Sequence, residues 1–181
     1  MAPKLIDPAP DFGDPLGLLA ACHSRIEAQC ATLLRLPGHL TANGCDPRAR
    51  QAAEKVLRYF TSAGPHHHED EEQDLFPLLE STARAEGATD MLALLGTLKA
   101  EHRGMEAAWA ALSPFLQRLA QGEQVEPGRL PVDPFVALYR SHMAREDVVL
   151  LPYAHRVLSP GQLESLGRGM ARRRHVDTGT L

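Results

Sequence analysis

A histidine and a glutamate four residues apart occur twice in the sequence, in the same chemical context. His67 precedes Glu71 and His142 precedes Glu146, and in both segments a leucine follows the histidine by eight residues and a proline by ten. In a helix, residues i and i+4 lie one above the other on the same face. Each segment therefore presents an imidazole and a carboxylate together. Because both pairs continue an apolar stripe, we expect them to face the interior of a helical fold.

Apolar residues that recur every three or four positions indicate four long amphipathic helices. The first begins at Asp14-Pro15, where an N-cap residue is followed by proline, and is expected to close at Pro37-Gly38. The same start signal returns at Asp46-Pro47 and at Asp133-Pro134, for the second and fourth helices. The third helix is expected between Met91 and Leu119.

The short connections between these helices favour an all-α, up-down-up-down four-helix bundle. Ser159-Pro160 predicts a short additional C-terminal helix, and the low aromatic content of 5% also suits helices better than sheets. We expect the bundle to span residues 14–174, with a flexible N-terminal segment over 1–13 and a disordered tail over 175–181. The only basic cluster, Arg172 to Arg174, is expected to be solvated.

Composition bears on partners and location. The formal net charge of −4 gives no reason to expect nucleic acid or an anionic membrane surface as a partner. No apolar run approaches the ~20 residues of a membrane span, and no secretory signal is visible. The three cysteines lack CxxC spacing, which favours reduced thiols. We therefore expect a cytoplasmic protein; whether it forms a homodimer or binds a protein partner is left open.

Each of the four helices carries one histidine near the middle of its apolar stripe. In an antiparallel bundle these positions meet at about one level. A buried polar group without a partner costs roughly 1–3 kcal/mol, and a buried carboxylate costs more unless a cation compensates it. Two metal ions would satisfy both kinds of group, with carboxylates as bridges and imidazoles as terminal ligands. The predicted metal ligands are His23, His67, Glu71, His102, His142 and Glu146.

The mixture of imidazole and carboxylate points to iron or manganese, and zinc also accepts such ligands. Six protein ligands around two octahedral metals leave positions for a solvent bridge and a small exogenous molecule. The expected cofactor is therefore two iron ions with an oxo or hydroxo bridge, and the expected partner is a diatomic molecule or a peroxide.

The two HxxxE segments with their downstream leucine and proline resemble hemerythrin-type HHE cation-binding domains. The resemblance covers about Pro15 to Leu158 and implies a four-helix bundle with a non-haem di-iron centre at the six positions above. The order of single His, HxxxE, single His, HxxxE is also similar to the di-iron domain of iron–sulfur-cluster repair proteins. Those proteins carry an additional N-terminal domain with cysteines, which this sequence does not show.

The sequence differs from the oxygen-carrying hemerythrins, whose pattern has an HxxxH pair where Glu71 stands here. We therefore rank reversible oxygen storage below redox handling of oxygen, nitric oxide or peroxide, for sensing or stress protection. Weak peroxidase, catalase-like or oxidase activity would fit such a centre. The alternatives are an iron-donor or storage module in iron–sulfur-centre repair and a structural zinc-binding bundle. Nothing in the sequence resembles a site for an organic substrate.

Specific positions are also expected for several residues near the predicted ligands. His68 is a candidate hydrogen-bond donor beside the centre or an alternative ligand, and Cys30 is expected to pack in the core. The Tyr153 hydroxyl could point toward the centre, and Leu138 and Val149 are placed on the inner face of the fourth helix. The acidic and amide residues between the ligands of the second helix are expected to form a solvated face: Glu69, Asp70, Glu72, Gln73 and Asp74.

Overall fold

The computed structural model describes residues 11–176 of the chain, which are almost entirely helical and contain no strand. The expectations for residues 1–10 and 177–181 lie outside the described residues. The long helices are α1 (Pro15–Asn43), α2 (Pro47–Glu69), α4 (Thr89–Ala120) and α5 (Val132–Arg145). The shorter elements are η1 (Asp70–Leu75), α3 (Phe76–Glu86), η2 (Pro127–Arg129), η3 (Glu146–Leu150), α6 (Leu151–Val157) and α7 (Pro160–Arg173).

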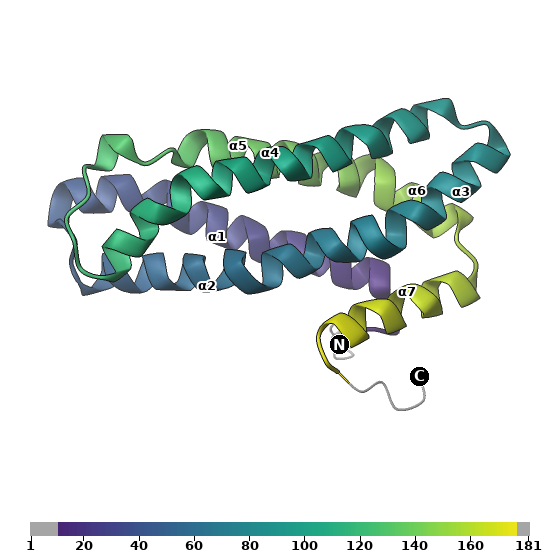
Figure 1. The fold of residues 1–181 in the computed structure, drawn as a ribbon, viewed down its shortest axis with the longest axis horizontal. Coiled ribbons are helices and arrows are strands. Elements are labelled where there is room, and N and C mark those ends of the chain that lie inside the picture. The colour runs from purple at the N-terminus through teal and green to yellow at the C-terminus, as the bar shows by residue number, and fades with distance from the viewer. Residues whose placement is uncertain (1–10, 177–181) are drawn as a thin grey trace, which may run out of the picture.

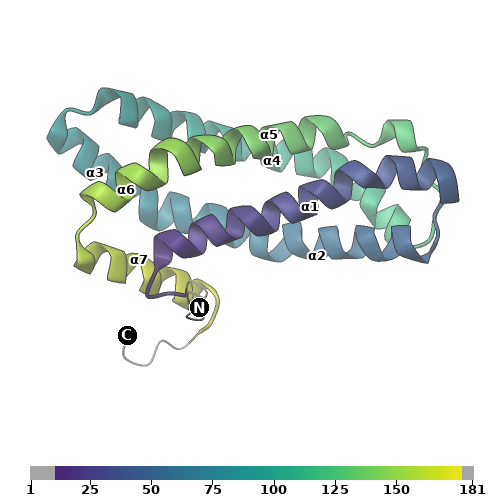
Figure 2. The same ribbon diagram turned by 180° about the vertical axis from the view of Figure 1, so that it is seen from behind.

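The elements form an up-down-up-down bundle, in which α2 continues through η1 into α3, and α5 continues through η3 into α6 (Figure 1). The α1–α2 and α4–α5 connections lie at one end of the bundle, and the α3–α4 turn lies at the other (Figure 1). The last helix, α7, lies outside the bundle against η1 and the beginning of α1 (Figure 2). The predicted all-α bundle with an additional C-terminal helix is confirmed. Between residues 11 and 176, no helix has the length and apolar character needed to cross a lipid bilayer.

The predicted starts of α1 and α2 are confirmed by their caps. Asp14 accepts a hydrogen bond from the backbone N–H of Gly17 at 3.0 Å, and Asp46 accepts one from that of Ala49 at 2.8 Å. Each aspartate thereby satisfies an N–H group that has no partner within the helix. At α7, Ser159 caps the helix as predicted.

Two predicted boundaries are wrong. Helix α1 does not close at Pro37-Gly38 but continues to Asn43, because its apolar stripe extends to the buried Leu40. It ends at Gly44, whose positive φ of 65° suits a glycine. Helix α5 starts at Val132, ahead of Asp133-Pro134, so this proline lies in the first turn, where no N–H is needed.

Both HxxxE segments lead into a π-helical turn, η1 or η3, inside an otherwise continuous helix. Each turn is followed by a proline, Pro77 or Pro152, whose missing N–H cannot make the usual helical hydrogen bond. Within η3, Leu150 is fully buried while Val149 is 45% exposed, so the predicted inner position of Val149 is wrong. On α5 the inner position belongs to Tyr139, which is buried, rather than to Leu138, which is exposed.

The apolar core is divided into two clusters. One is built around Ile26, Phe60 and Met105, near the α1–α2 end of the bundle. The other is built around Leu19, Phe76 and Leu98, near the α3–α4 end, and includes residues of α7. Along the stretches that contain α1, α2 and α4, the predicted metal ligands lie between residues of the first cluster and residues of the second. On the fourth stretch, Glu146 lies between the two clusters, and His142 precedes Met143, the last residue of the first cluster. The bundle therefore places a polar layer between two apolar halves.

Candidate metal centre

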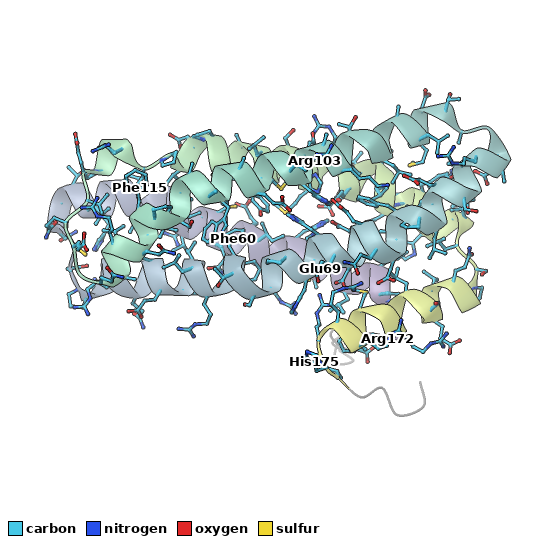
Figure 3. The ribbon with its side chains drawn as sticks, viewed as in Figure 1. Phe60, Glu69, Arg103, Phe115, Arg172 and His175 are labelled. Carbon is cyan, nitrogen blue, oxygen red and sulfur yellow. The ribbon has the colours of Figure 1, made fainter. Side chains whose placement is uncertain are left out.

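The polar layer consists of six buried side chains that come from all four helical stretches of the bundle. His23 is 5% exposed, and the other five are at most 1% exposed. In Figure 3, nitrogen and oxygen atoms gather in the interior near the middle of the bundle. The six residues are those predicted from the sequence: His23, His67, Glu71, His102, His142 and Glu146.

These side chains form two groups of four that could each hold a metal ion. One group is His23, His67, Glu71 and Glu146, and the other is Glu71, His102, His142 and Glu146. Within each group the nitrogen and carboxylate oxygen atoms lie within 4.8 Å of one another. Glu71 and Glu146 belong to both groups. Because both carboxylates are shared, they could bridge a pair of cations.

The Nε2 atoms of all four histidines face the centre. The Nε2 atoms of His102 and His142 are 3.0 Å apart. Those of His23 and His67 lie 3.2 Å from Glu146 Oε2 and 3.3 Å from Glu71 Oε1, respectively. His102 Nε2 is also 3.3 Å from Glu71 Oε2, and His142 Nε2 is 3.0 Å from Glu146 Oε1. Nitrogen and oxygen atoms thus converge on a common space without apolar atoms between them.

Several of these inward-facing atoms are buried and lack a hydrogen-bond partner among the described residues. They are Nε2 of His23, Nε2 of His67, Oε2 of Glu71 and both carboxylate oxygens of Glu146. Orphaned polar atoms are costly in a protein interior, and these five gather at one point. Divalent cations would satisfy them, because imidazole nitrogen and carboxylate oxygen are ligands of iron, manganese and zinc. The residues fit a two-metal centre.

Three of the four imidazoles are held from behind by a carboxylate. His23 donates from Nδ1–H to Asp147 at 2.7 Å, and His102 donates from Nδ1–H to Glu72 at 2.7 Å. His142 donates from Nδ1–H to Glu101 at 3.0 Å. Such a bond fixes the tautomer in which Nε2 is free to bind a metal. His67 differs, because its buried Nδ1 has no such partner among the described residues.

These outer carboxylates were not predicted from the sequence; Glu72 is exposed as predicted, but it also binds His102. Glu72 and Asp147 each directly follow a predicted ligand, Glu71 or Glu146, and this repeated acidic pair is the signal that could have indicated them. Glu101 likewise precedes His102 and also binds Arg145 at 2.7 Å. All three carboxylates support an imidazole on another helix, which spacing along one helix does not reveal.

The two shared carboxylates differ in protonation preference. Burial raises the pKa of Glu71 well above its ordinary value, and the nearby charge of Glu146 adds to the shift. Burial also acts to raise the pKa of Glu146, but hydrogen bonds with His142 and His23 outweigh it and lower this pKa. Without cations, the centre therefore favours one neutral and one charged carboxylate.

The four histidines also form two pairs, one with lowered and one with raised pKa values. Burial and the neighbouring histidines lower the pKa of His67 to about 3, and burial also lowers the pKa of His102. Burial opposes the charged forms of His23 and His142 as well, but their carboxylate partners outweigh it and raise both pKa values. His67 and His102 are thus neutral near pH 7, the form that binds a metal.

One buried carboxylate outside the centre changes the interpretation of the C-terminal arginines. Asp70 is fully buried and is bound by Arg173 and by Arg174, whose Nη2 lies 2.6 Å from Asp70 Oδ2. Arg173 also binds Asp74 at 2.7 Å. The predicted solvation of Asp70, Arg173 and Arg174 is therefore wrong, because α7 folds back onto η1; Arg172, labelled in Figure 3, is exposed as predicted.

Two further residues near the centre have clear positions. Cys30 is fully buried in the first apolar cluster, as expected, and burial raises the pKa of its thiol to about 12. Tyr153 does not point toward the centre, since its hydroxyl donates to Glu86 at 2.9 Å.

Comparisons with known proteins agree with this geometry. The family model of the hemerythrin HHE cation binding domain matches residues 14–154. An uncharacterized protein of Haemophilus influenzae is 30% identical over 165 residues, which cover 91% of this chain and 92% of that protein. The matched region contains all six side chains of the centre.

Proposed function

Since the chain belongs to the hemerythrin HHE cation-binding domain family, we propose that it is a non-haem di-iron protein that binds a small molecule. The small molecule is oxygen, nitric oxide or a peroxide, and its redox handling serves sensing or protection against oxidative or nitrosative stress. The observation that carries the proposal is the set of buried, orphaned nitrogen and oxygen atoms that converge in two groups with shared carboxylates.

In this proposal each iron is held by two histidines and by both carboxylates. His23 and His67 would hold one iron, His102 and His142 would hold the other, and Glu71 and Glu146, which belong to both groups, would be shared between them. Four protein ligands leave open positions on an octahedral metal. When bound, the iron pair would supply ligand binding and electron transfer, which none of the side chains could supply alone.

The side chains themselves have three tasks. The carboxylates of Asp147, Glu72 and Glu101 orient the imidazoles and make them better ligands. The two apolar clusters exclude bulk water from either side of the centre. Glu71, whose pKa is raised by burial, releases its proton when cations enter.

The test is the metal content of protein purified without a polyhistidine tag from iron-replete cells. We expect about two irons per chain, the stoichiometry of a two-metal site, with visible absorption that changes on adding nitric oxide to the reduced protein. Glu71→Ala and Glu146→Ala should each lose most of the iron, whereas Glu54→Ala, at an exposed position of α2, should retain it.

The outcomes separate the proposed function from its alternatives. Zinc in place of iron, with no response to nitric oxide, would contradict the redox function and leave a structural zinc-binding bundle. Iron that passes readily to an apo iron–sulfur protein, again without a response to nitric oxide, would instead identify an iron-donor module.

A further inference from the structure

A small cavity lies between α2, α4 and α5, on the side of the centre formed by His102 and His142. Its volume is about 120 Å³, and its walls include His68, Met105, Glu106, Trp109 and Tyr139. Since a water molecule occupies roughly 30 Å³ of liquid, this space suits a diatomic molecule or a peroxide and excludes most organic metabolites.

His68 forms the wall between this cavity and the candidate centre. Its ring stacks on the ring of His102, with centroids 4.0 Å apart and planes 12° apart, and its centroid is 6.4 Å from that of His142. Because His68 directly follows His67, its side chain points about 100° away around the helix. It belongs to neither of the two groups that could hold a metal.

The ring nitrogens of His68 have no assigned task in the protein. Among residues 11–176 no side chain or backbone group hydrogen-bonds to them, although the ring is half-buried. The other inner walls are largely apolar: Met105 is fully buried, and Phe60 is 4% exposed. A polar ring with unused nitrogens in such a cavity is placed to bind a guest molecule.

The larger groove beside the centre is a less suitable place for the small molecule. It has a volume of about 570 Å³ and reaches His23 and Asp147 between α1 and α5. Asp147 occupies the Nδ1 side of His23, whereas Nε2 of His23 faces Glu146 in the interior. A molecule in this groove therefore meets the outer edge of His23 among charged side chains such as Glu27 and Arg140, whereas the smaller cavity is largely apolar.

We propose that the cavity beside His68 holds the small molecule before it reaches the centre, and that His68 donates a hydrogen bond to it there. The inference depends on the proposed function and specifies where and how the small molecule is bound. Because the walls are mostly apolar and bury the guest, the pocket selects an uncharged molecule over an anion. Glu106 and Trp109, which are less buried than Met105, form the mouth of the pocket.

The hydrogen bond is tested with nitric oxide on the reduced, iron-loaded protein. His68→Phe keeps an aromatic ring over His102 but has no donor, whereas His68→Gln keeps an N–H donor. We expect His68→Phe to retain its iron and to bind nitric oxide three- to tenfold more slowly, the size of one neutral hydrogen bond lost from the cavity. His68→Gln should restore most of the association rate, and His155→Phe, at an exposed position, should match the wild type.

The route is tested with two tryptophan substitutions at exposed positions. Glu106→Trp obstructs the mouth of the pocket, and Ser24→Trp obstructs the groove beside His23. We expect Glu106→Trp alone to slow the association of nitric oxide. Slowing by Ser24→Trp alone, or an unchanged association rate in His68→Phe, would overturn the inference while leaving the iron centre intact.

A measurement without iron chemistry separates the pocket from the proposed function. Under xenon pressure, the methyl signal of Met105 in the zinc-loaded protein should shift, and Glu106→Trp should slow the exchange. If the methyl signal of Met105 did not shift with xenon pressure, the proposed pocket would be overturned, whatever the metal content. A protein that shows the shift but binds no nitric oxide in its iron-loaded form would overturn both the proposed function and the hydrogen bond assigned to His68.

Discussion

At the scale of single residues, the centre depends on carboxylates that never touch its interior. Asp147 is half-exposed, yet it holds Nδ1 of the buried His23 at 2.7 Å. Replacing it with asparagine keeps an acceptor but removes the charge that makes the imidazole a stronger ligand. We expect Asp147→Asn to lower metal affinity about tenfold, the lower end of the range for such partners, because solvent screens the exposed carboxylate.

Equilibrium competition with a chelator would measure this affinity. Asp133→Asn, at an exposed position on α5, is the matched control and should leave the affinity unchanged. Equal affinities in wild type and Asp147→Asn would mean that His23 needs no support from its carboxylate.

His67 offers a second prediction at this scale, for the metal-free protein. Its pKa is about 3 in the folded state because of burial, against an ordinary value of 6.5, so the unfolded chain binds an additional proton between these values. The stability contributed by neutral His67 is therefore present above pH 6.5 and lost as pH falls toward 3. Relative to His67→Gln, wild type should lose about 2 kcal/mol of unfolding free energy between about pH 7.5 and 5.

Chemical unfolding of both proteins at the two pH values would show this difference. His155→Gln, at an exposed position, should follow the wild type at both pH values. A wild-type stability that is independent of pH relative to His67→Gln would show that the folded state accepts the proton on His67.

The six inward-facing residues could be predicted from the sequence because each interrupts an apolar stripe at a fixed helical spacing. Their supporting carboxylates could not, because His23 and Asp147 come from different helices and meet only in the folded bundle. His68 shows the same limit. Its position beside His67 was evident, but its stacking on His102 depends on how α2 packs against α4.

At the scale of elements, α7 is joined to the candidate centre through Asp70, the residue before Glu71. Two guanidinium groups, from Arg173 and Arg174, compensate this fully buried carboxylate. The helix also packs very closely, since a Cβ atom on Gly167 would lie 1.9 Å from the carbonyl oxygen of Phe12. Helix α7 is therefore an integral part of the fold rather than an appendage.

Removing both guanidinium groups leaves Asp70 buried without a counterion. We expect the double variant Arg173→Gln/Arg174→Gln to lose about 3 kcal/mol of unfolding free energy, as for other broken buried ion pairs. Chemical unfolding would measure the loss, with the exposed Arg172→Gln as control. If the double variant were as stable as Arg172→Gln, Asp70 would have to reach water or become protonated at little cost.

The ends and turns of the helices show which local signals are reliable. Aspartate caps at Asp14 and Asp46 were predicted correctly, because a cap depends on residues within one turn. Pro37 failed as a stop signal, because burial of Leu40 favours the longer helix. The π-helical turns η1 and η3 were not predicted, since the apolar spacing on either side of them fits an ordinary α-helix.

At the scale of the whole molecule, the polar layer interrupts what would otherwise be one continuous core. The two apolar clusters lie on opposite sides of it, so the halves of the bundle contact each other through imidazoles and carboxylates. Without cations, several of these groups are buried and unpaired. The metal-free layer therefore carries an uncompensated cost, and bound cations would join the two halves of the bundle.

Metal removal should accordingly lower the thermal stability of the entire bundle. A metal present at about 100 times its dissociation constant stabilises by about 2.7 kcal/mol, which corresponds to a shift in Tm of roughly 5–10 °C for a chain of this size. Chelation should produce this shift in the wild type and in Glu54→Gln. Glu71→Gln should show little shift, because it lacks one bridging carboxylate.

The Tm values of the metal-free wild type and the metal-free Glu71→Gln variant provide a second comparison. Burial raises the pKa of Glu71 in the absence of cations, so the neutral amide of Glu71→Gln should be tolerated there as well as the wild-type side chain. We therefore expect the metal-free Glu71→Gln protein to unfold at or above the Tm of the metal-free wild type, and below that of the metal-loaded wild type. A metal-free variant much less stable than the metal-free wild type would mean that Glu71 stabilises the fold directly, rather than through the cations that it would bind.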